Sequence, residues 1–363
     1  MKRVALLGGS RFIGYHLLLA LLKKEHKITL YNRGESCPPS PFPDNVEIIK
    51  GNRNRPKDLN RLFNKDYDVV FDLSGYTSSH IEPIINRFQP RIGHYIFCST
   101  TAVYSRTQNS PLNEESSRDF TSNTYGGEKA LAEDLLMNKS KETNWPVTIF
   151  RPNMVFGSFD PGPPTRKLRF LFNRINQSLP IPINPENKVR FNLLHVDDLV
   201  RAFILASENP NSHNKFYCVA SDNYVTELDL IKLSAELCVQ KPILHVVNDP
   251  DYNELKIGSP WPNEELLVDN TKIKKDLGIN FTKLNITINN TFDWFRKTPN
   301  YYGKTEFRGE KYILKNLMVP RRVKLFWKCI DWINLFIYWL YQFMWIKDSK
   351  PVLLAKKILR KFL

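Results

Sequence analysis

The sequence predicts an α/β fold in which a doubly wound parallel sheet is followed by a smaller C-terminal substrate lobe and an α-helical C-terminal extension. Two observations predict the sheet. Short apolar runs alternate with segments of helical periodicity from residue 3 to residue 100, as in strands joined by crossover helices. These runs are apolar throughout, as expected when helices cover both faces of a sheet. At 363 residues, the chain also exceeds the usual size of one hydrophobic core.

The elements follow in a regular order. Residues 3–8 form the first expected strand, apolar residues then recur at helical spacing over 12–22, and HKITLYN is the second strand. Further strands are expected at VEIIKGN, DVVFDLSG and HYIFCST. Helical segments near residues 59–63 and 81–88 separate them. This alternation favours crossover connections between parallel strands.

A glycine-rich turn joins the first strand to the first helix. It consists of Gly8, Gly9, Ser10, Arg11, Phe12, Ile13 and Gly14. In this position a tight turn lets the helix N-terminus face a pyrophosphate. The turn therefore predicts a Rossmann-type, dinucleotide-binding domain. The alternative is a purely structural turn.

The second strand ends without the acidic residue that binds the ribose of NAD. Asn32 and Arg33 stand there instead, and an arginine suits a 2′-phosphate. Arg11 is a second cation for the same group, so NADP is the first choice of cofactor and NAD the second. The alternative is that Arg33 is a solvated loop residue and that Asn32 holds either ribose.

Tyr125 and Lys129 lie four residues apart, which places a phenol and an ammonium on one face of a helix. Chance can supply that spacing. A strand ending at Thr100 and a P-x-x-E segment ending at Glu114 precede the pair. A lysine cation favours the phenolate of a tyrosine, whose ordinary pKa is about 10. We expect Tyr125 to exchange a proton with a substrate oxygen that Thr100 also binds, while hydride moves to or from nicotinamide. The alternative is a packed Tyr125 and a solvated Lys129.

These motifs resemble the extended short-chain dehydrogenase/reductase superfamily, whose active region has the same order of a strand ending in Ser or Thr, a P-x-x-E segment and Y-x-x-x-K. Arg11 replaces the usual middle glycine, as in atypical members that include sugar-epimerase-like proteins and chloroplast RNA-binding relatives. The resemblance covers residues 1 to about 297. It implies that Lys129 also contacts the nicotinamide ribose. Further cofactor contacts that it implies are Asn52 and Arg53 near the adenine, Leu73, Ser74 and Gly75 beside the cofactor path, and Pro152 and Asn153 near the nicotinamide.

Other motifs limit the chemistry. The segment NLLHVDDL resembles the family's structural H-V-D-D-L, so we expect no metal site at His195, Asp197 and Asp198. The related 4,6-dehydratases carry Asp-Glu after Thr100, whereas this chain has Thr101 and Ala102, which argues against that elimination.

Composition shifts define three regions. Many Pro and Asn residues follow VTIFRPNMVFG, and Lys, Arg and aromatic residues dominate after Trp294. We expect a dinucleotide-binding domain over 1–157. A mainly substrate-binding lobe is expected over 158–299, with some segments returning to the first domain, and a basic, aromatic helical extension over 300–363.

The extension carries most of the net charge of +15. Residues 301–363 hold 14 Lys or Arg and 4 Asp or Glu, a net +10, which leaves +5 for the first 300 residues. Aromatic residues and a polar stripe over 327–346, followed by a basic amphipathic segment, favour helices lying on a membrane surface. A membrane span, or packing against the protein itself or a partner, are the alternatives. Five widely spaced cysteines and the absence of a leader pattern favour a reducing, cytoplasmic location.

The leading hypothesis is an NAD(P)-dependent oxidoreductase or epimerase. Its substrate is a small molecule with a sugar-like hydroxyl or carbonyl, nucleotide-linked or lipid-linked. A sterol-type membrane-associated dehydrogenase is one alternative, and a non-catalytic RNA-binding or scaffold protein is another. Nucleic acid is the less favoured partner because the body is near neutral. A homodimer stays open.

Overall fold

The computed structural model describes residues 1–298, apart from 37, 106–109, 162–166, 185, 187, 247–260 and 263. The expected extension over 300–363, with its membrane-surface helices, lies outside the described residues. Within the described part, no helix combines the length and apolar character needed to cross a membrane.

A seven-stranded sheet organises the N-terminal lobe of the described chain, in the order β11-β6-β5-β4-β1-β2-β3. Every neighbouring pair is parallel. The strands are β1 (Arg3–Leu7), β2 (Lys27–Asn32), β3 (Val46–Lys50), β4 (Tyr67–Asp72), β5 (Ile92–Cys98), β6 (Val147–Pro152) and β11 (Lys215–Val219). The expected α/β class with a parallel, doubly wound sheet is confirmed. Strand order reverses between β1 and β4, where such sheets bind ligands.

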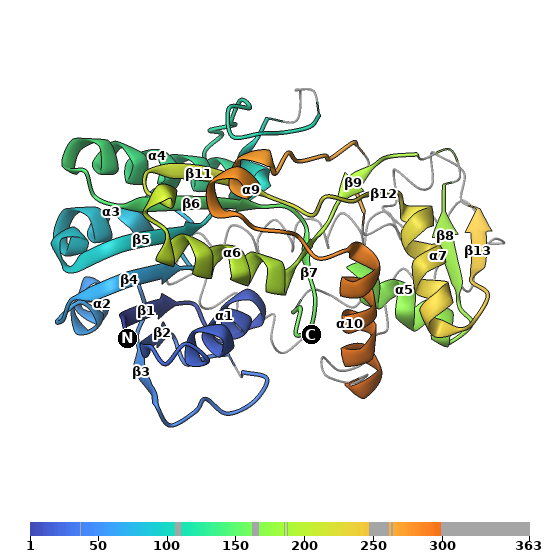
Figure 1. The fold of residues 1–363 in the computed structure, drawn as a ribbon, viewed down its shortest axis with the longest axis horizontal. Coiled ribbons are helices and arrows are strands. Elements are labelled where there is room, and N and C mark those ends of the chain that lie inside the picture. The colour runs from blue at the N-terminus through green and yellow to red at the C-terminus, as the bar shows by residue number, and fades with distance from the viewer. Residues whose placement is uncertain are drawn as a thin grey trace, which may run out of the picture.

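Helices cover both faces of this sheet (Figure 1). One face carries α1 (Phe12–Leu22), α6 (Val196–Glu208) and α9 (Thr271–Leu277). The other carries α2 (Pro56–Leu62), α3 (Ser78–Pro83), the π-helical η1 (Ile84–Phe88) and α4 (Tyr125–Thr143). Short 3-10 turns complete this part: η2 (Gln89–Arg91), η3 (Thr101–Val103) and η4 (Pro210–Ser212).

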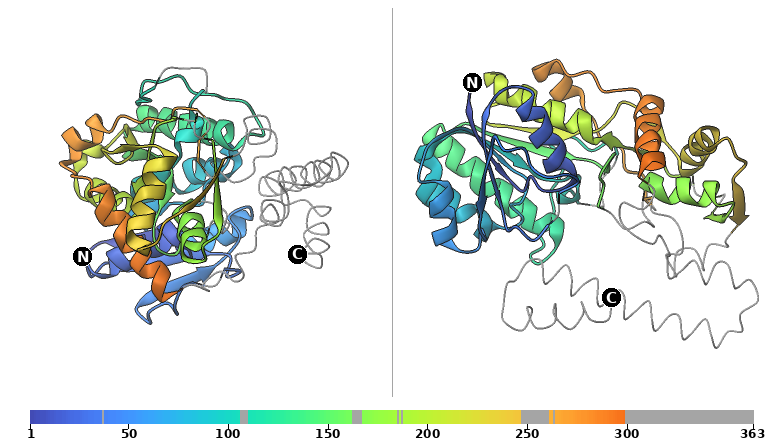
Figure 2. Two further views of the ribbon diagram at one scale, coloured as in Figure 1. Left: turned by 90° about the vertical axis from the view of Figure 1, so that its right-hand side faces the viewer. Right: turned by 90° about the horizontal axis from the view of Figure 1, so that it is seen from below.

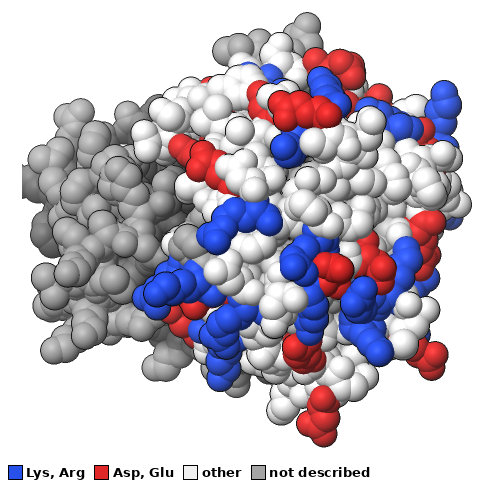
Figure 3. Space-filling model, turned by 90° about the vertical axis from the view of Figure 1, so that its left-hand side faces the viewer, with Lys and Arg blue, Asp and Glu red and all other residues white. Residues whose placement is uncertain are grey.

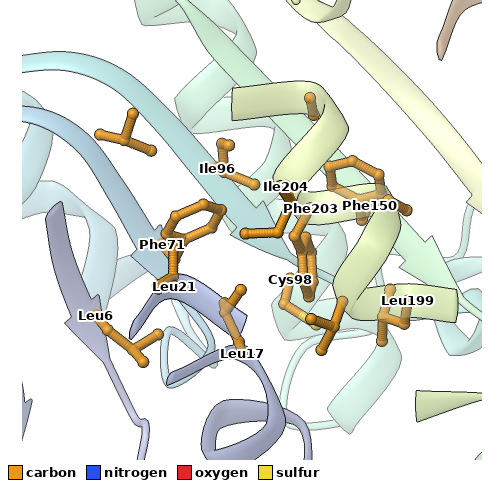
Figure 4. Packing of buried hydrophobic residues seen from close by; sticks show 14 of the residues in the cluster. Leu6, Leu17, Leu21, Phe71, Ile96, Cys98, Phe150, Leu199, Phe203 and Ile204 are labelled. Carbon is orange, nitrogen blue, oxygen red and sulfur yellow. The ribbon is translucent and has the colours of Figure 1, made fainter. Parts of the chain in front are cut away.

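The core between α1, α6 and the sheet explains why the strand sequences are apolar. Phe71 and Phe150 from the strands meet Phe203 of α6, with ring centroids 6.2 and 4.9 Å from the Phe203 ring (Figure 4). Leu6 and Leu17 pack in the same cluster and are fully buried. Burying each such side chain contributes about 1.5–3 kcal/mol before entropy is counted.

The second lobe lies at the other end of the described molecule, as Figure 1 and the right-hand view of Figure 2 show. Its larger elements are α5 (Lys167–Asn176), β8 (Pro180–Ile183), α7 (Glu227–Cys238), β13 (Ile243–Val246) and α10 (Leu284–Lys297). Its short strands, which connect it to the sheet, are β7 (Val155–Phe156), β9 (Phe191–Asn192), β10 (Leu194–His195) and β12 (Tyr224–Val225). A separate apolar cluster holds it together, in which Phe191 stacks on Trp261 at 5.4 Å.

The chain returns to the sheet after entering this lobe. Residues of β11 pair with β6, from Lys215 opposite Thr148 to Val219 opposite Pro152. The sheet edge beyond β6 is therefore supplied by the second half of the chain.

Candidate active site

The glycine turn bends sharply between β1 and α1. Gly8 has a φ of 99°, which an L side chain rarely adopts. A Cβ at Gly14 would lie 2.2 Å from the Gly8 carbonyl oxygen, and one at Gly9 would lie 2.4 Å from a methyl carbon of Leu30. At Gly14 the clash would be with the backbone, so only glycine allows this approach. The resulting cradle at the N-terminus of α1 fits a pyrophosphate.

The other residues of the turn differ in exposure. Ser10 and Phe12 are buried, Ile13 is half-buried, and Arg11 is exposed. Arg11 occupies the N-cap position of α1 with an extended backbone and makes no side-chain cap bond. Its guanidinium is therefore on the surface beside the helix N-terminus, where an anionic group would be attracted.

The segment after β4 lies against this turn. A Cβ on Gly8 would be 3.1 Å from the Ser74 Cβ, and the Leu73 amide donates to the Leu7 carbonyl (3.0 Å). The amides of Ser74 and Gly75 donate to Asp72 Oδ1 at 2.9 and 2.8 Å. The structure thus brings Leu73–Gly75 and the glycine turn together at the point where strand order reverses.

Arg53 points into the protein. Its two terminal nitrogens donate to the two carboxylate oxygens of Asp72, each at 2.8 Å, and one also donates to Ser74 Oγ at 3.0 Å. Arg53 is 8% exposed and Asp72 is fully buried. Burial alone would raise the pKa of Asp72, but the charge and hydrogen bonds of Arg53 outweigh it and hold that pKa below its ordinary range. The guanidinium therefore supports the loop after β4.

Asn52, Asn32 and Arg33 lie at the carboxyl ends of the outer strands. Asn52 is half-buried, and its side-chain oxygen accepts from the Asn54 amide at 3.0 Å. Asn32 is half-buried too, and its side-chain oxygen accepts from the Gly34 amide at 2.7 Å. The Arg33 side chain is 48% exposed, with Nε 3.6 Å from a Glu35 oxygen. Adenine and ribose contacts by these residues stay predictions.

Glycines also bring the tyrosine to the end of β5. Thr124 caps α4 by accepting from the Gly127 amide at 3.0 Å, so Tyr125 is the first helical residue. A Cβ at Gly126 would lie 1.9 Å from the Ala102 carbonyl oxygen. The close approach of α4 to the segment after Thr100 thus requires glycine at 126. Gly127 is required by a different neighbour, because a Cβ there would lie 2.0 Å from the Thr121 carbonyl oxygen.

Thr100, Tyr125 and Lys129 all lie near the carboxyl end of β5: Lys129 bonds to the Cys98 carbonyl, and Tyr125 is beside Thr100. Thr100 caps η3, and its hydroxyl oxygen accepts from the Ala102 amide at 3.2 Å. Tyr125 is 43% exposed, so a substrate can reach it. The low-polarity surroundings of its hydroxyl raise the pKa of Tyr125 above its ordinary value, although hydrogen bonding from Thr100 acts in the opposite direction.

Lys129 is almost fully buried, at 2% exposure. Its Nζ donates to the Cys98 carbonyl at 2.6 Å. Burial lowers the pKa of Lys129 to about 8, against the influence of nearby Cys98 and Asp72. The ammonium contacts the rings of Tyr76 and Phe97, residues for which the motifs gave no signal. The one indication for Tyr76 is its position directly after the predicted segment Leu73–Gly75.

Pro152 is the last residue of β6, and Asn153 follows it. Asn153 is fully buried; its amide nitrogen donates to the Asn192 carbonyl at 2.8 Å, and its oxygen accepts from the Thr101 hydroxyl at 3.1 Å. It therefore joins the end of β5 to β9. A cofactor contact by Pro152 or Asn153 stays a prediction.

The remaining motifs make hydrogen bonds within the protein. Glu114 of P-x-x-E accepts from the Cys218 amide at 2.8 Å. Asp198 accepts from the amide and the hydroxyl of Thr282, at 2.9 and 2.7 Å. His195 accepts from the Asp197 amide at 3.3 Å. In the part of the chain that the structure describes, no group of three or more His, Cys, Asp or Glu side chains is arranged to hold a metal ion.

Comparison with known proteins identifies relatives over much of the chain. Residues 4–220 match the NAD dependent epimerase/dehydratase family. The chain is 31% identical over 251 residues to the chloroplast stem-loop binding protein of 41 kDa b from Arabidopsis thaliana, covering 65% of this chain and 63% of that protein. It is 26% identical over 275 residues to the dTDP-D-glucose 4,6-dehydratase of Dictyostelium discoideum, covering 64% and 61%. The matches thus span less than two thirds of either relative.

Solved structures share the fold. A UDP-N-acetylglucosamine 4-epimerase from Methanobrevibacter ruminantium superposes with a TM-score of 0.69 at 22% identity, covering 82% of this chain and 99% of that one. A dTDP-glucose 4,6-dehydratase from Bacillus anthracis in complex with NAD gives 0.70 at 15% identity, covering 83% and 99%. With the family match over residues 4–220, these findings show that the chain belongs to the NAD dependent epimerase/dehydratase family.

Proposed function

We propose that this protein is an NAD(P)-dependent oxidoreductase or epimerase that acts on a hydroxyl or carbonyl carbon of a sugar-like substrate. One observation carries the proposal: a single edge of the sheet holds both the glycine cradle and the Thr100–Tyr125–Lys129 group. The nicotinamide, when bound, supplies the hydride chemistry.

Tyr125 and Thr100 handle the proton. Because the pKa of Tyr125 is raised, the phenol is the resting form and can protonate a substrate carbonyl oxygen directly. Thr100 hydrogen-bonds that same oxygen. In the opposite direction Tyr125 must release its proton first, and the Lys129 cation, present below a pKa of about 8, favours that release.

The decisive experiment compares Tyr125→Phe with wild type in hydride transfer from labelled cofactor and in product analysis, across UDP- and dTDP-sugars. We expect turnover to fall by about 10²–10⁴-fold while cofactor binding is retained, since only the proton donor is lost. The control is Tyr224→Phe at a tyrosine of similar exposure, 51% against 43%. Equal turnover in wild type and Tyr125→Phe would contradict the proposal.

The residues at the end of β2, which we expect to lie beside the adenosine ribose, favour NADP over NAD. No carboxylate ends β2, and Arg33 holds Glu35 only loosely, so its guanidinium is free to exchange Glu35 for a 2′-phosphate. We expect Arg33→Ala to weaken NADP binding by about 10-fold or more and to leave NAD binding unchanged. The matched control is Arg91→Ala, which removes a similarly exposed arginine paired with Asp66. Isothermal titration with both cofactors measures the difference, and equal losses for both would contradict NADP selectivity.

Two observations support a substrate class: the names of several relatives and the composition of residues 327–363. The names of several relatives specify UDP- or dTDP-linked sugars, which supports a nucleotide-linked sugar. The aromatic, basic composition of residues 327–363 supports attachment to an anionic membrane surface in the cytoplasm, and with it a lipid-linked substrate. A sterol-type alcohol is the alternative on the same membrane argument.

RNA binding is the second candidate function, because the relative that shares 31% identity is named for stem-loop binding. Charge argues against it: on the face shown in Figure 3, Lys and Arg are interspersed with Asp and Glu. RNA retention measured at rising salt distinguishes RNA binding from the proposed oxidoreductase or epimerase function. Strong retention that falls steeply with salt, together with no thermal stabilisation by NAD or NADP, would favour the RNA-binding function.

A further inference from the structure

Tyr76 stands beside both members of the tyrosine–lysine pair. It lies on the loop between β4 and α3, where its amide donates to His80 Nδ1 at 3.1 Å. The centre of its ring is 4.9 Å from Lys129 Nζ and 6.3 Å from the centre of the Tyr125 ring. None of the motifs that define the site includes it.

The surroundings of Lys129 show what such a ring can do. The ammonium is removed from water, at 2% exposure, and donates to the Cys98 carbonyl. An ammonium has three donors, so one carbonyl does not replace its hydration. The Phe97 ring centre is 4.5 Å from Nζ, and Tyr76 supplies a second ring at 4.9 Å. Aromatic faces attract a cation most strongly where water is excluded.

The charged and titratable neighbours do not by themselves stabilise the cation. Cys98 of β5, Asp72 of β4 and Glu133 of α4 favour the charged lysine, and Arg53 opposes it. Asp72 is already neutralised by its bidentate pair with Arg53. Glu133 is likewise paired, with Arg151 at 2.7 Å. Tyr125 adds a neutral phenol. Among the described residues, the Tyr76 and Phe97 rings add two further favourable contacts to the ammonium.

We propose that Tyr76 is a positioning residue: with Phe97 it forms an aromatic sandwich that holds the desolvated Lys129 ammonium one helical turn from Tyr125. The effect on turnover rests on the proposed function. The effect on Lys129 itself does not, and it can be measured without substrate or cofactor.

The first test titrates Lys129 directly in the full chain. Acetylation by acetic anhydride is followed over a pH series by peptide mass spectrometry, with the exposed Lys141 of the same helix as the internal reference. Tyr76→Leu, which keeps the site apolar and removes the ring, is expected to lower the titration midpoint of Lys129 by about one pH unit. Tyr76→Phe keeps the ring and is expected to titrate like wild type.

Three results would overturn the proposal. They are an unchanged midpoint in Tyr76→Leu, a rise in that variant, and an equal fall in the Leu and Phe variants. The first shows that the ring does not act on Lys129, the second that it serves only to exclude water, and the third that the hydroxyl is responsible. If Tyr76→Leu does not fold, Tyr76→Met carries the same expectation.

The kinetic test uses the pH profile of kcat/KM. Because the lysine cation is lost above its pKa, activity should fall on the alkaline side, with the fall beginning about one pH unit lower in Tyr76→Leu and unchanged in Tyr76→Phe. If the Lys129 midpoint shifts in Tyr76→Leu but wild type shows no activity, the proposed function is refuted and the role of Tyr76 is supported. If the enzyme is active but neither the alkaline fall in kcat/KM nor the Lys129 titration midpoint changes in Tyr76→Leu, the proposed function is supported and the role of Tyr76 is refuted.

Discussion

The buried ion pair between Arg53 and Asp72 stabilises the loop after β4. Asp72→Asn would leave the buried guanidinium without a counter-charge, so we expect the free energy of unfolding to fall by about 3–5 kcal/mol. Urea denaturation measures it. The control is Asp66→Asn, which breaks the exposed Arg91–Asp66 pair and should cost less than about 1 kcal/mol. Similar losses in the two variants would contradict the assigned role.

The same pair gives stability a defined pH dependence. The pKa of Asp72 is lower in the folded than in the unfolded state, where it is about 4. Its contribution is therefore complete above pH 4 and is lost as the pH falls toward the folded-state value. Wild type should lose stability below about pH 4 more steeply than Asp72→Asn, so the gap between their urea midpoints should narrow. A gap that stays constant from neutral to acidic pH would argue against this linkage.

At the scale of residues, sequence reasoning identified the groups that local patterns define. The glycine turn and the Y-x-x-x-K spacing depend on neighbours in the chain, and the structure places both at one edge of the sheet. The inward turn of Arg53 depends on Asp72, nineteen residues away on another strand, and the ring of Tyr76 meets Lys129 across the sheet edge. Contacts of that kind have no local signature.

The turn between β1 and α1 has no room for an added methyl group at Gly14. In Gly14→Ala, the new Cβ would collide with the Gly8 carbonyl oxygen, so α1 must move away from β1 and open the cradle. We expect the thermal stabilisation by NAD or NADP to be lost, as measured by the shift in Tm on adding cofactor. A shift equal to that of wild type would contradict the assignment of the cradle.

The control for this element is Gly278→Ala at the C-cap of α9. Gly278 has a φ of 64°, and a Cβ there would meet nothing within 4 Å. We therefore expect a loss of roughly 1–2 kcal/mol from backbone strain alone, with the cofactor-induced shift in Tm intact.

Elements were predictable where one periodicity dominated. The N-terminal strands and α1 follow from apolar runs and helical spacing. The short strands β7, β9, β10 and β12 have two residues each, too few for any period to be read. Their positions are set by partners such as Asn153 and Asn192, whose side chains bond across segments distant in sequence.

At the scale of the whole molecule, the uneven distribution of net charge predicts which part of the chain binds an anionic membrane. Residues 301–363 carry a net +10 and the first 300 residues +5. If the tail attaches to membranes, full-length chain should float with vesicles containing phosphatidylserine, and a chain ending at Thr298 should not. Raising salt from 0.1 to 1 M shortens the screening length from about 10 to about 3 Å and should weaken flotation. Equal flotation of the two chains would remove the tail as the anchor.

The return of β11 to the sheet has a consequence for how this architecture can be divided. A fragment ending near residue 157 would contain every residue of the proposed catalytic group, yet β6 would lose its outer neighbour along its whole length. An uncovered apolar edge strand is a template for intermolecular pairing. Residues 1–157 therefore contain the proposed catalytic group, but the strand that covers the outer edge of β6 comes from residues 215–219, so we expect an isolated N-terminal fragment to associate through that edge.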